Sequence, residues 1–523
     1  LQILTRQDGD RVALAGSGLT IYAIMENSII AEGSEAAILK TGLSYRKIET
    51  IDPDGTFYLA YPPGNLSLYE ARRFIGQYGQ ILAEDHNTFF IQVKSRPIDY
   101  LLDHQFHLAA VSRRPIVPSF TRPYYIPPAP SYNPVIKWII DQITVGEVSG
   151  MLRDLTGERP TTIRGRLDTI VSRYTTNVKN SSAIWYFYER ASSYMGIDSV
   201  RFHPFTWSSY TDSNIVVTKI GRVYPRQQYI LCAHIDCVPS SGRAPGADDN
   251  GTSTIAVLIG AKVTARIPFK RTIKFIAFNA EEQGIYGSAR YASEARARGD
   301  SILGALNGEM LGYNIRSRDS ANAAHGNRAG SRVLTQRFYE MDTTYHIGLN
   351  IRQQASTPGG SDHQSFWNNG YEAACFWEWV LTPYYHTAND RITTLDTVFM
   401  TKMIKCLVAT ICDLAEPDTV FAQVVDEKMR DRSSGIDISI LPNPARRSAE
   451  ISYHLPRGEN VLIEIYDRIG RRLVRWRRSR PAGDHHLIWD GYSSEGNPAP
   501  SGVYFVKLVS GKEAKVQRFV LLR

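Results

Sequence analysis

The sequence predicts an α/β protein: a mostly parallel sheet with helices on both faces, preceded by an N-terminal α+β region and followed by an immunoglobulin-like β-sandwich. Three observations lead to this fold class. Between residues 135 and 425, helical patterns alternate with apolar runs, as in parallel sheets covered by helices. Two of these runs are apolar almost throughout, as in strands buried on both faces. After residue 437, the chain breaks into short alternating runs, which favours a sandwich.

The first region, 1–112, combines short β-rich runs with one helical stretch. The β-rich runs cover 19–24, 56–60 and 88–93, and the helical pattern covers 68–78. The region carries no catalytic motif, so it is interpreted as a propeptide, an accessory domain or part of the substrate wall. A proline-rich linker, 113–134, follows and is expected to be extended, because proline fixes φ and lacks an N–H donor.

The central domain, 135–425, is predicted from alternating helix and strand patterns. Helical periodicity covers 163–174 and 182–194, and the runs YILCA (229–233) and IKFIAF (273–278) are predicted strands. A short linker, 426–436, is expected to separate this domain from the sandwich, 437–523.

Basic charge is concentrated at the C-terminal end. The chain carries a net charge of +8, and residues 437–523 hold 15 basic and 9 acidic side chains, so the rest is nearly neutral. Nucleic acid is therefore not expected as a partner. The arginine-rich run 468–480 supports a rival hypothesis, a non-enzymatic surface protein that binds anions, although solvated strand faces are the favoured interpretation. No apolar run reaches the roughly 18 residues that a transmembrane helix requires.

Carboxylate and imidazole side chains follow the predicted strands of the central domain, where ligands bind in open parallel sheets. Taken alone, each has an ordinary explanation as a capping or turn residue. Together they suit zinc, which binds imidazole nitrogen and carboxylate oxygen, with an uncoordinated carboxylate as general base. The set predicts metal-assisted hydrolysis with two metal ions. In chain order, the candidates are His234, Asp236, Asp248, Glu281, Glu282, Glu309 and His386.

The segments that carry these candidates resemble a known family. His-x-Asp, GADDNG, AEEQGIYGS, NGEMLGYN, SDHQSF and YYHTANDR are similar, in order and approximate spacing, to the di-zinc exopeptidases. This family includes bacterial leucyl aminopeptidases, glutamate carboxypeptidases and glutaminyl cyclases. The resemblance covers about residues 145–416. It implies the zinc exopeptidase fold, two Zn²⁺ ions, peptide substrates and an exopeptidase that hydrolyses N-terminal residues through a metal-activated water.

The resemblance also implies a metal ligand set. By position, His234 and Glu309 bind the first zinc ion, and Glu282 and His386 bind the second. Asp248 is the implied bridge between the two ions.

Two further carboxylates receive catalytic roles from the same resemblance. Glu281 corresponds to the general base, and Asp236 to the carboxylate that orients the His234 ring. Glu309 departs from the pattern, because aminopeptidases of this family usually carry Asp there and Glu is more frequent among carboxypeptidase-type relatives. Carboxypeptidase-type and glutaminyl-cyclase-type chemistry on the same fold are therefore kept as alternatives.

Several other residues near His386 are expected to shape the pocket. Asp362 and His363 match the Ser-Asp-His segment of the family and are interpreted as pocket support rather than ligands. For any single aromatic residue of this stretch a core position is favoured, with one or two lining an apolar pocket. These aromatic residues are Phe366, Trp367, Phe376, Trp377, Trp379, Tyr384 and Tyr385.

The C-terminal segment has a resemblance of its own. Pro442-Asn443-Pro444, VLIEIYDRIGRR, HHLIWDG, SGVYFVKL and the final VLLR are similar to the β-sandwich sorting domain of the type IX secretion pathway. This resemblance implies the secretion machinery as a partner and a secreted or cell-surface location. The alternative is that the sandwich is merely an accessory module.

Overall fold

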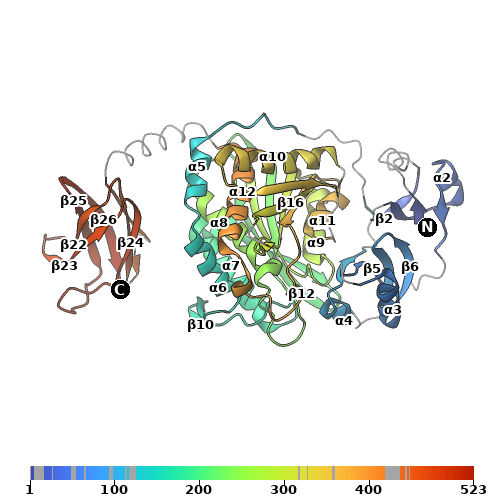
Figure 1. Ribbon diagram of the computed structural model, residues 1–523, viewed down its shortest axis with the longest axis horizontal. Coiled ribbons are helices and arrows are strands. Elements are labelled where there is room, and N and C mark those ends of the chain that lie inside the picture. The colour runs from blue at the N-terminus through green and yellow to red at the C-terminus, as the bar shows by residue number, and fades with distance from the viewer. Residues whose placement is uncertain are drawn as a thin grey trace. The chain divides into compact units, whose positions relative to one another are not determined.

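The computed structural model divides the chain into two compact units, Leu1–Asp418 and Thr419–Arg523 (Figure 1). Parts of both predicted linkers and the motif Pro442-Asn443-Pro444 lie outside the residues that the structure describes. The predicted subdivision of the first unit therefore stays a prediction. The described residues are 2–4, 14, 17–25, 27–48, 55–63, 66–93, 98–111, 115–116, 125–315, 318–326, 328–355, 360–417, 436–441, 445–446 and 448–523.

An eight-stranded sheet forms the centre of the first unit, with strand order β11-β12-β14-β13-β15-β18-β16-β17. Neighbours among its four middle strands pair in parallel, which confirms the predicted mostly parallel sheet. The middle strands are β14 (Arg271–Phe278), β13 (Tyr224–His234), β15 (Ser301–Glu309) and β18 (Ala373–Glu378). The outer strands are β11 (Val200–Trp207), β12 (Tyr210–Lys219), β16 (Ser320–Ala324) and β17 (Asn350–Gln354).

Helices cover both faces of this sheet, as the apolar strands predict (Figure 1). Residues of β13 alternate between the faces: Cys232 packs in a cluster with Tyr291 of α9, while Leu231 lies close to Gly260 of α8. A Cβ atom on Gly260 would lie 2.8 Å from the Phe275 ring, so glycine allows this close approach. One face carries α7 (Val178–Met195), α8 (Ser253–Thr264), α10 (Ala329–Tyr345) and α12 (Thr397–Ala415), with α5 (Pro134–Asp141) and α6 (Val145–Leu155) packed on them, and the other carries α9 (Tyr286–Arg298) and α11 (Asp362–Asn368).

One predicted helix is wrong. The segment 163–174 contains no helix; it begins at the end of β9 (Thr161–Ile163), which pairs antiparallel with β10 (Arg166–Asp168). Arg164 and Gly165 between them have φ values of 51° and 73°. Two successive left-handed residues form the tight turn of a hairpin and end any helix, which the apolar spacing alone does not reveal. The second predicted helix, 182–194, is confirmed by α7.

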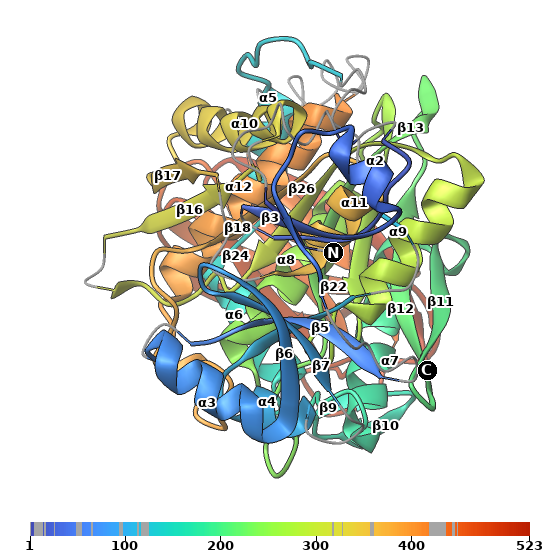
Figure 2. The same ribbon diagram turned by 90° about the vertical axis from the view of Figure 1, so that its right-hand side faces the viewer.

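The N-terminal region contains two four-stranded sheets and short helices, which confirms the α+β prediction. One of these sheets lies within residues 56–110. On one of its faces, α3 and α4 pack against β5 and β7 around Ile75, Ile91 and Leu101 (Figure 2). Its elements are β5 (Thr56–Tyr61), α3 (Leu68–Tyr78), β6 (Gly79–Asp85), β7 (Thr88–Val93), α4 (Ile98–Asp103) and β8 (His107–Ala110). The other sheet comprises β1 (Gln2–Leu4), β2 (Thr20–Ile24), β3 (Ser28–Glu32) and β4 (Tyr45–Arg46), with α2 (Glu35–Leu39).

The second unit consists of a three-stranded and a five-stranded sheet, in agreement with the predicted sandwich. Trp489, Tyr504 and Phe519 pack ring against ring in its apolar core. Its strands are β19 (Asp437–Leu441), β20 (Ala445–Arg446), β21 (Ala449–Leu455), β22 (Glu459–Asp467), β23 (Arg472–Arg480), β24 (Gly483–Trp489), β25 (Gly502–Ser510) and β26 (Glu513–Leu522). Among the described residues of the whole chain, no helix is long and apolar enough to span a membrane.

Candidate metal centre

The candidate ligands meet at the carboxyl edge of the central sheet. His234 is the last residue of β13, and Glu309 is the last residue of β15, its neighbour in the sheet. Glu281 and Glu282 follow the end of β14 after two residues. Because parallel strands end at the same edge, residues that are up to 75 positions apart in sequence come within hydrogen-bond distance.

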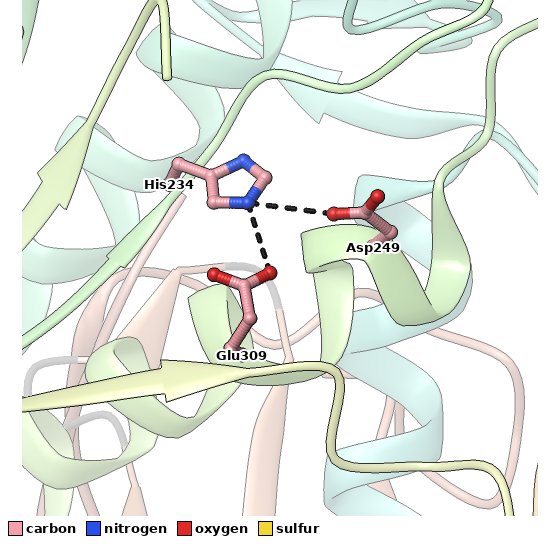
Figure 3. A group of neighbouring side chains, drawn as sticks. All are labelled: His234, Asp249 and Glu309. Atoms are coloured by element: carbon pink, nitrogen blue, oxygen red, sulfur yellow. Dashed lines mark hydrogen bonds and ion pairs between the residues drawn. The ribbon is translucent and has the colours of Figure 1, made fainter. Parts of the chain in front are cut away.

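A first group of ligand atoms consists of His234, Asp249 and Glu309 (Figure 3). The Nε2 atom of His234 lies 3.2 Å from Oε1 of Glu309 and 3.4 Å from Oδ1 of Asp249. His234 and Asp249 are buried, and the Glu309 side chain is 13% exposed. Three converging oxygen and nitrogen atoms of this kind match the donor set that zinc prefers.

A second group consists of Asp249, Glu282 and His386. The Nε2 atom of His386 lies 3.1 Å from Oε2 of Glu282 and 3.3 Å from Oδ2 of Asp249. All three side chains are buried. Asp249 thus offers one carboxylate oxygen to each group, the arrangement of a ligand shared by two ions.

Both groups share the carboxylate of Asp249, whereas the resemblance implied Asp248 as the bridge between the two ions, and that role stays a prediction. The Asp248 carboxylate lies outside both groups, because its Oδ1 atom accepts hydrogen bonds from Gly312 N and Thr252 Oγ1 at 2.9 and 3.3 Å. Both aspartates stand in the GADDNG turn, where the backbone between Ala247 and Thr252 is irregular. The side-chain directions of two neighbours in such a turn depend on backbone angles that the residue types alone do not specify.

Asp236 holds the turn that carries Glu281 and Glu282. Its two carboxylate oxygens accept hydrogen bonds from Glu281 N and Glu282 N at 3.2 and 3.1 Å. The expected contact with the His234 ring is longer, at 3.7 Å between Nδ1 and Oδ1, and the main-chain oxygen of Asp236 lies closer to Nδ1, at 3.2 Å. The residue therefore orients the ring through its backbone and the two glutamates through its side chain.

Three further residues support the site, and no sequence motif assigns them a role. Asp390 accepts hydrogen bonds from the backbone N–H groups of Asp248 and Asp249, each at 2.9 Å, and so fixes the turn. Ser361 donates from Oγ to Oε2 of Glu309 at 2.6 Å. Arg173 is fully buried and donates to the carbonyl oxygens of Ile235, Pro245 and Gly246. Asp390 lies inside the motif YYHTANDR and Ser361 inside SDHQSF, so these motifs could have indicated both residues as part of the site. Arg173 lies in none of the motifs and could not have been found in this way.

The site concentrates negative charge. Burial lowers the pKa of the His386 imidazole, but the Glu282 and Asp249 carboxylates outweigh it and raise the pKa to about 10. The pKa of His234 is likewise well above its ordinary value, because Glu309 and Glu281 outweigh burial. Burial also raises the pKa of Glu281 well above its usual range. The carboxylates therefore favour bound cations, and divalent metal ions held here would supply positive charge without protonation of the histidines.

The polar atoms that are left without partners also fit a metal centre. Oε1 of Glu281 and Oε1 of Glu282 are buried and have no hydrogen-bond partner among the described residues. Buried polar atoms in proteins are almost always paired, so each such atom needs an explanation. Bound metal ions and a water molecule would satisfy these atoms. The residues present therefore fit the metal ions that the resemblance implies.

A cavity of about 520 Å³ opens onto these groups. Of the aromatic residues near His386, Trp367, Trp377 and Tyr385 line it, whereas Phe366 and Phe376 are fully buried in the core. His363 lines the cavity, and Asp362 is buried; neither belongs to a ligand group, in line with the predicted supporting role. The remaining lining includes residues of the N-terminal region, among them Tyr61, Gln105 and His107.

Comparisons with known proteins match two parts of the chain. Residues 214–411 match "Peptidase family M28", and residues 439–522 match "Secretion system C-terminal sorting domain". A probable leucine aminopeptidase of Trichophyton verrucosum is 26% identical over 249 residues, 45% of this chain and 64% of that protein. Aminopeptidase YwaD of Bacillus subtilis is 32% identical over 197 residues, 36% of this chain and 41% of that protein. The chain thus spans less than two thirds of the length of these relatives.

Solved structures show the same fold. The LapA aminopeptidase of Legionella pneumophila aligns with a TM-score of 0.53 at 20% identity, covering 69% of this chain and 98% of that one. LapB of the same organism aligns with a TM-score of 0.54 at 18% identity, covering 69% of this chain and 99% of that one. At these identities the likeness concerns the fold alone.

Proposed function

Because the central domain of this chain belongs to peptidase family M28 and is followed by a secretion sorting domain, we propose that the protein is a secreted zinc-dependent aminopeptidase. Its proposed reaction is the hydrolysis of N-terminal residues from peptides. The sorting domain indicates a secreted or cell-surface protein and supports the secretion machinery as a partner.

One observation carries the proposal: two ligand groups share Asp249, with an uncoordinated glutamate beside them. Oε2 of Glu281 lies 3.9 Å from Nε2 of His234, outside both groups. Two Zn²⁺ ions bound by these residues would supply Lewis acidity toward a peptide carbonyl and lower the pKa of a water molecule. His234, Asp249 and Glu309 would hold one ion, and Asp249, Glu282 and His386 the other.

Glu281 is positioned to move the proton of the reaction. Its carboxylate is buried, and its backbone is fixed by Asp236. It accepts a proton from the water that attacks the peptide carbonyl and donates that proton to the nitrogen of the leaving amine. The carbon–nitrogen bond breaks, and the products are a free amino acid and a peptide shortened by one residue.

Glu309 is compatible with this proposal despite its longer side chain. Its Oε1 atom reaches His234 at 3.2 Å, and Ser361 holds its second oxygen, so the extra methylene does not remove the carboxylate from the first group. The curated relatives above are all named as aminopeptidases, which supports this direction of attack over a carboxypeptidase or cyclase reaction.

A substrate panel on the full chain tests the proposal. We expect zinc-loaded protein to release leucine from leucyl p-nitroanilide and from leucyl peptides, and to leave N-acetylated versions of the same peptides intact. Chelation followed by restoration of Zn²⁺ should abolish and then recover activity, with total zinc measured by atomic emission. Release of C-terminal residues from the acetylated peptides, or cyclisation of N-terminal glutamine without peptide hydrolysis, would overturn the aminopeptidase assignment.

A further inference from the structure

A segment of the N-terminal region, residues 98–110, contacts the metal centre directly; we call it the α4–β8 segment. The backbone oxygen of Leu102 accepts a hydrogen bond from Nδ1 of His386 at 3.2 Å. Gln105 donates from Nε2 to the backbone oxygen of Tyr385 at 3.0 Å. The ring of a candidate metal ligand is therefore oriented by a residue that lies 284 positions earlier in the chain.

Further contacts anchor the α4–β8 segment on both sides of the site. Ala110 N donates to the backbone oxygen of Gly284 at 3.1 Å, three residues after Glu281. Asp103 accepts from the backbone N–H and the hydroxyl of Ser240, at 3.0 and 2.8 Å. The segment is thus held where β14 and β13 end, and it forms one wall of the cavity.

His107, the first residue of β8, brings an unpaired polar atom into that wall. Its side chain is 13% exposed, and Nε2 has no hydrogen-bond partner among the described residues. This atom lies 3.8 Å from Oε1 of Glu281, which is too long for a hydrogen bond, and Oε1 is unpaired as well. Two buried polar atoms that face each other across this gap indicate a place for a polar group of a ligand.

The position of His107 relative to Glu281 indicates which part of a peptide lies there. Oε2 of Glu281 faces His234 and the metal groups, whereas Oε1 faces His107. A general base that takes a proton from water on the metal side must release that proton to the leaving amine. The Oε1 atom of Glu281 is the carboxylate oxygen on the side away from His234. The leaving part of the peptide therefore fits on the His107 side.

We propose that the α4–β8 segment forms the leaving-group side of the substrate pocket and that His107 hydrogen-bonds the departing part of the peptide. The inference rests on the aminopeptidase function proposed above. It makes the N-terminal region a working part of the active site rather than a removable propeptide.

The charge state of His107 is consistent with this role. Burial and the nearby His386 imidazole lower the pKa of His107 to about 3, so the ring is neutral at physiological pH. A neutral imidazole offers a single donor or acceptor at Nε2 without repelling bound cations. A peptide leaving group has both an amide N–H and a carbonyl oxygen for such a contact, whereas p-nitroaniline lacks the carbonyl and the following backbone.

The test compares two substrates in His107→Ala. We expect kcat/KM for leucyl-glycyl-glycine to fall about tenfold, the scale of one lost hydrogen bond, and kcat/KM for leucyl p-nitroanilide to change less than about twofold. His107→Gln places an amide near the position of Nε2 and should recover most of the peptide activity. Thermal melts establish that each variant is folded.

His104→Ala is the matched control, because His104 belongs to the same segment but is exposed and is not among the residues that line this cavity. It should leave both substrates unaffected. Equal losses on both substrates in His107→Ala, or no recovery in His107→Gln, would overturn the inference while leaving the aminopeptidase function intact. If the wild-type protein hydrolysed neither substrate, both proposals would fall.

A second experiment tests the whole N-terminal region, which includes the α4–β8 segment, without substituting any residue of the pocket. A protease recognition site inserted between Ala129 and Pro130 allows the full chain to be cut after folding and the fragments to be separated. Activity should persist while the N-terminal fragment stays bound and fall once it is removed. Activity that rises on removal contradicts the inference and identifies the region as an inhibitor.

Discussion

The two compact units bury charge in opposite ways. In the first unit, Glu281 is buried, and its Oε1 atom has no hydrogen-bond partner among the described residues. In the second unit, Glu464 is buried and is paired with Arg472 and Arg475 at 3.1 and 3.5 Å. Burying a charge is costly unless it is compensated. Arginine side chains compensate Glu464 within the protein, whereas Oε1 of Glu281 is left without such a partner beside the ligand groups.

The largest effect is expected for Glu281→Gln. The amide keeps the shape of the side chain but cannot carry the proton, so kcat should fall by about 10²–10⁴-fold with metal content unchanged. Glu495→Gln, an exposed glutamate of the second unit, is the control and should have wild-type activity. Wild-type kcat in Glu281→Gln would remove the proposed base and break the comparison.

The neighbours Asp248 and Asp249 provide a sharper test within the first unit. Asp249→Asn removes the charge shared by both ligand groups and should lower zinc content as well as activity. Asp248→Asn affects only the support of the turn, and its loss of metal affinity should stay within about 10–100-fold. Zinc titrations of both variants decide the assignment. A larger loss in Asp248→Asn would return the bridging role to that residue.

Mutations in the core of the second unit should lower the stability of that unit and leave the peptidase activity unchanged. Trp489 is fully buried among Tyr504 and Phe519, so Trp489→Ala should destabilise this unit by about 3–5 kcal/mol. In denaturant titrations the transition of the second unit should shift, while leucyl p-nitroanilide hydrolysis stays constant. Coupled loss of activity would show that the units are not independent.

The smallest effect is expected at the arginine-rich strand β23. Arg477 is exposed, and substitutions at such positions usually change stability by less than about 0.5 kcal/mol. Arg477→Gln should therefore leave the melting temperature and the peptidase activity unchanged. Salt-dependent DNA or glycan binding by the wild-type chain that this variant weakens would instead revive the anion-binding hypothesis.

Most strands were predictable because their residues are apolar throughout or alternate between apolar and polar. The structure contains strands with both patterns. YILCA and IKFIAF lie in β13 and β14. Of the seven candidate site residues, four belong to the two ligand groups, and a fifth, Glu281, lies beside them. The hairpin around Gly165 was missed, because its turn depends on backbone angles rather than on hydrophobic spacing. Trp367 and Phe366 are adjacent in sequence, yet one lines the cavity and the other is core.

The sequence by itself determined the kind of chemistry: strand ends that carry His234, Glu282 and Glu309 predict a metal centre, because residue type decides which atoms are available as ligands. Only the tertiary structure decided which aspartate of GADDNG is shared by the two ligand groups and that His107, far away in the chain, lies 3.8 Å from Glu281. The reason is physical. Direction and proximity depend on backbone angles and on the packing of distant segments, and neither is encoded in a local run of residues.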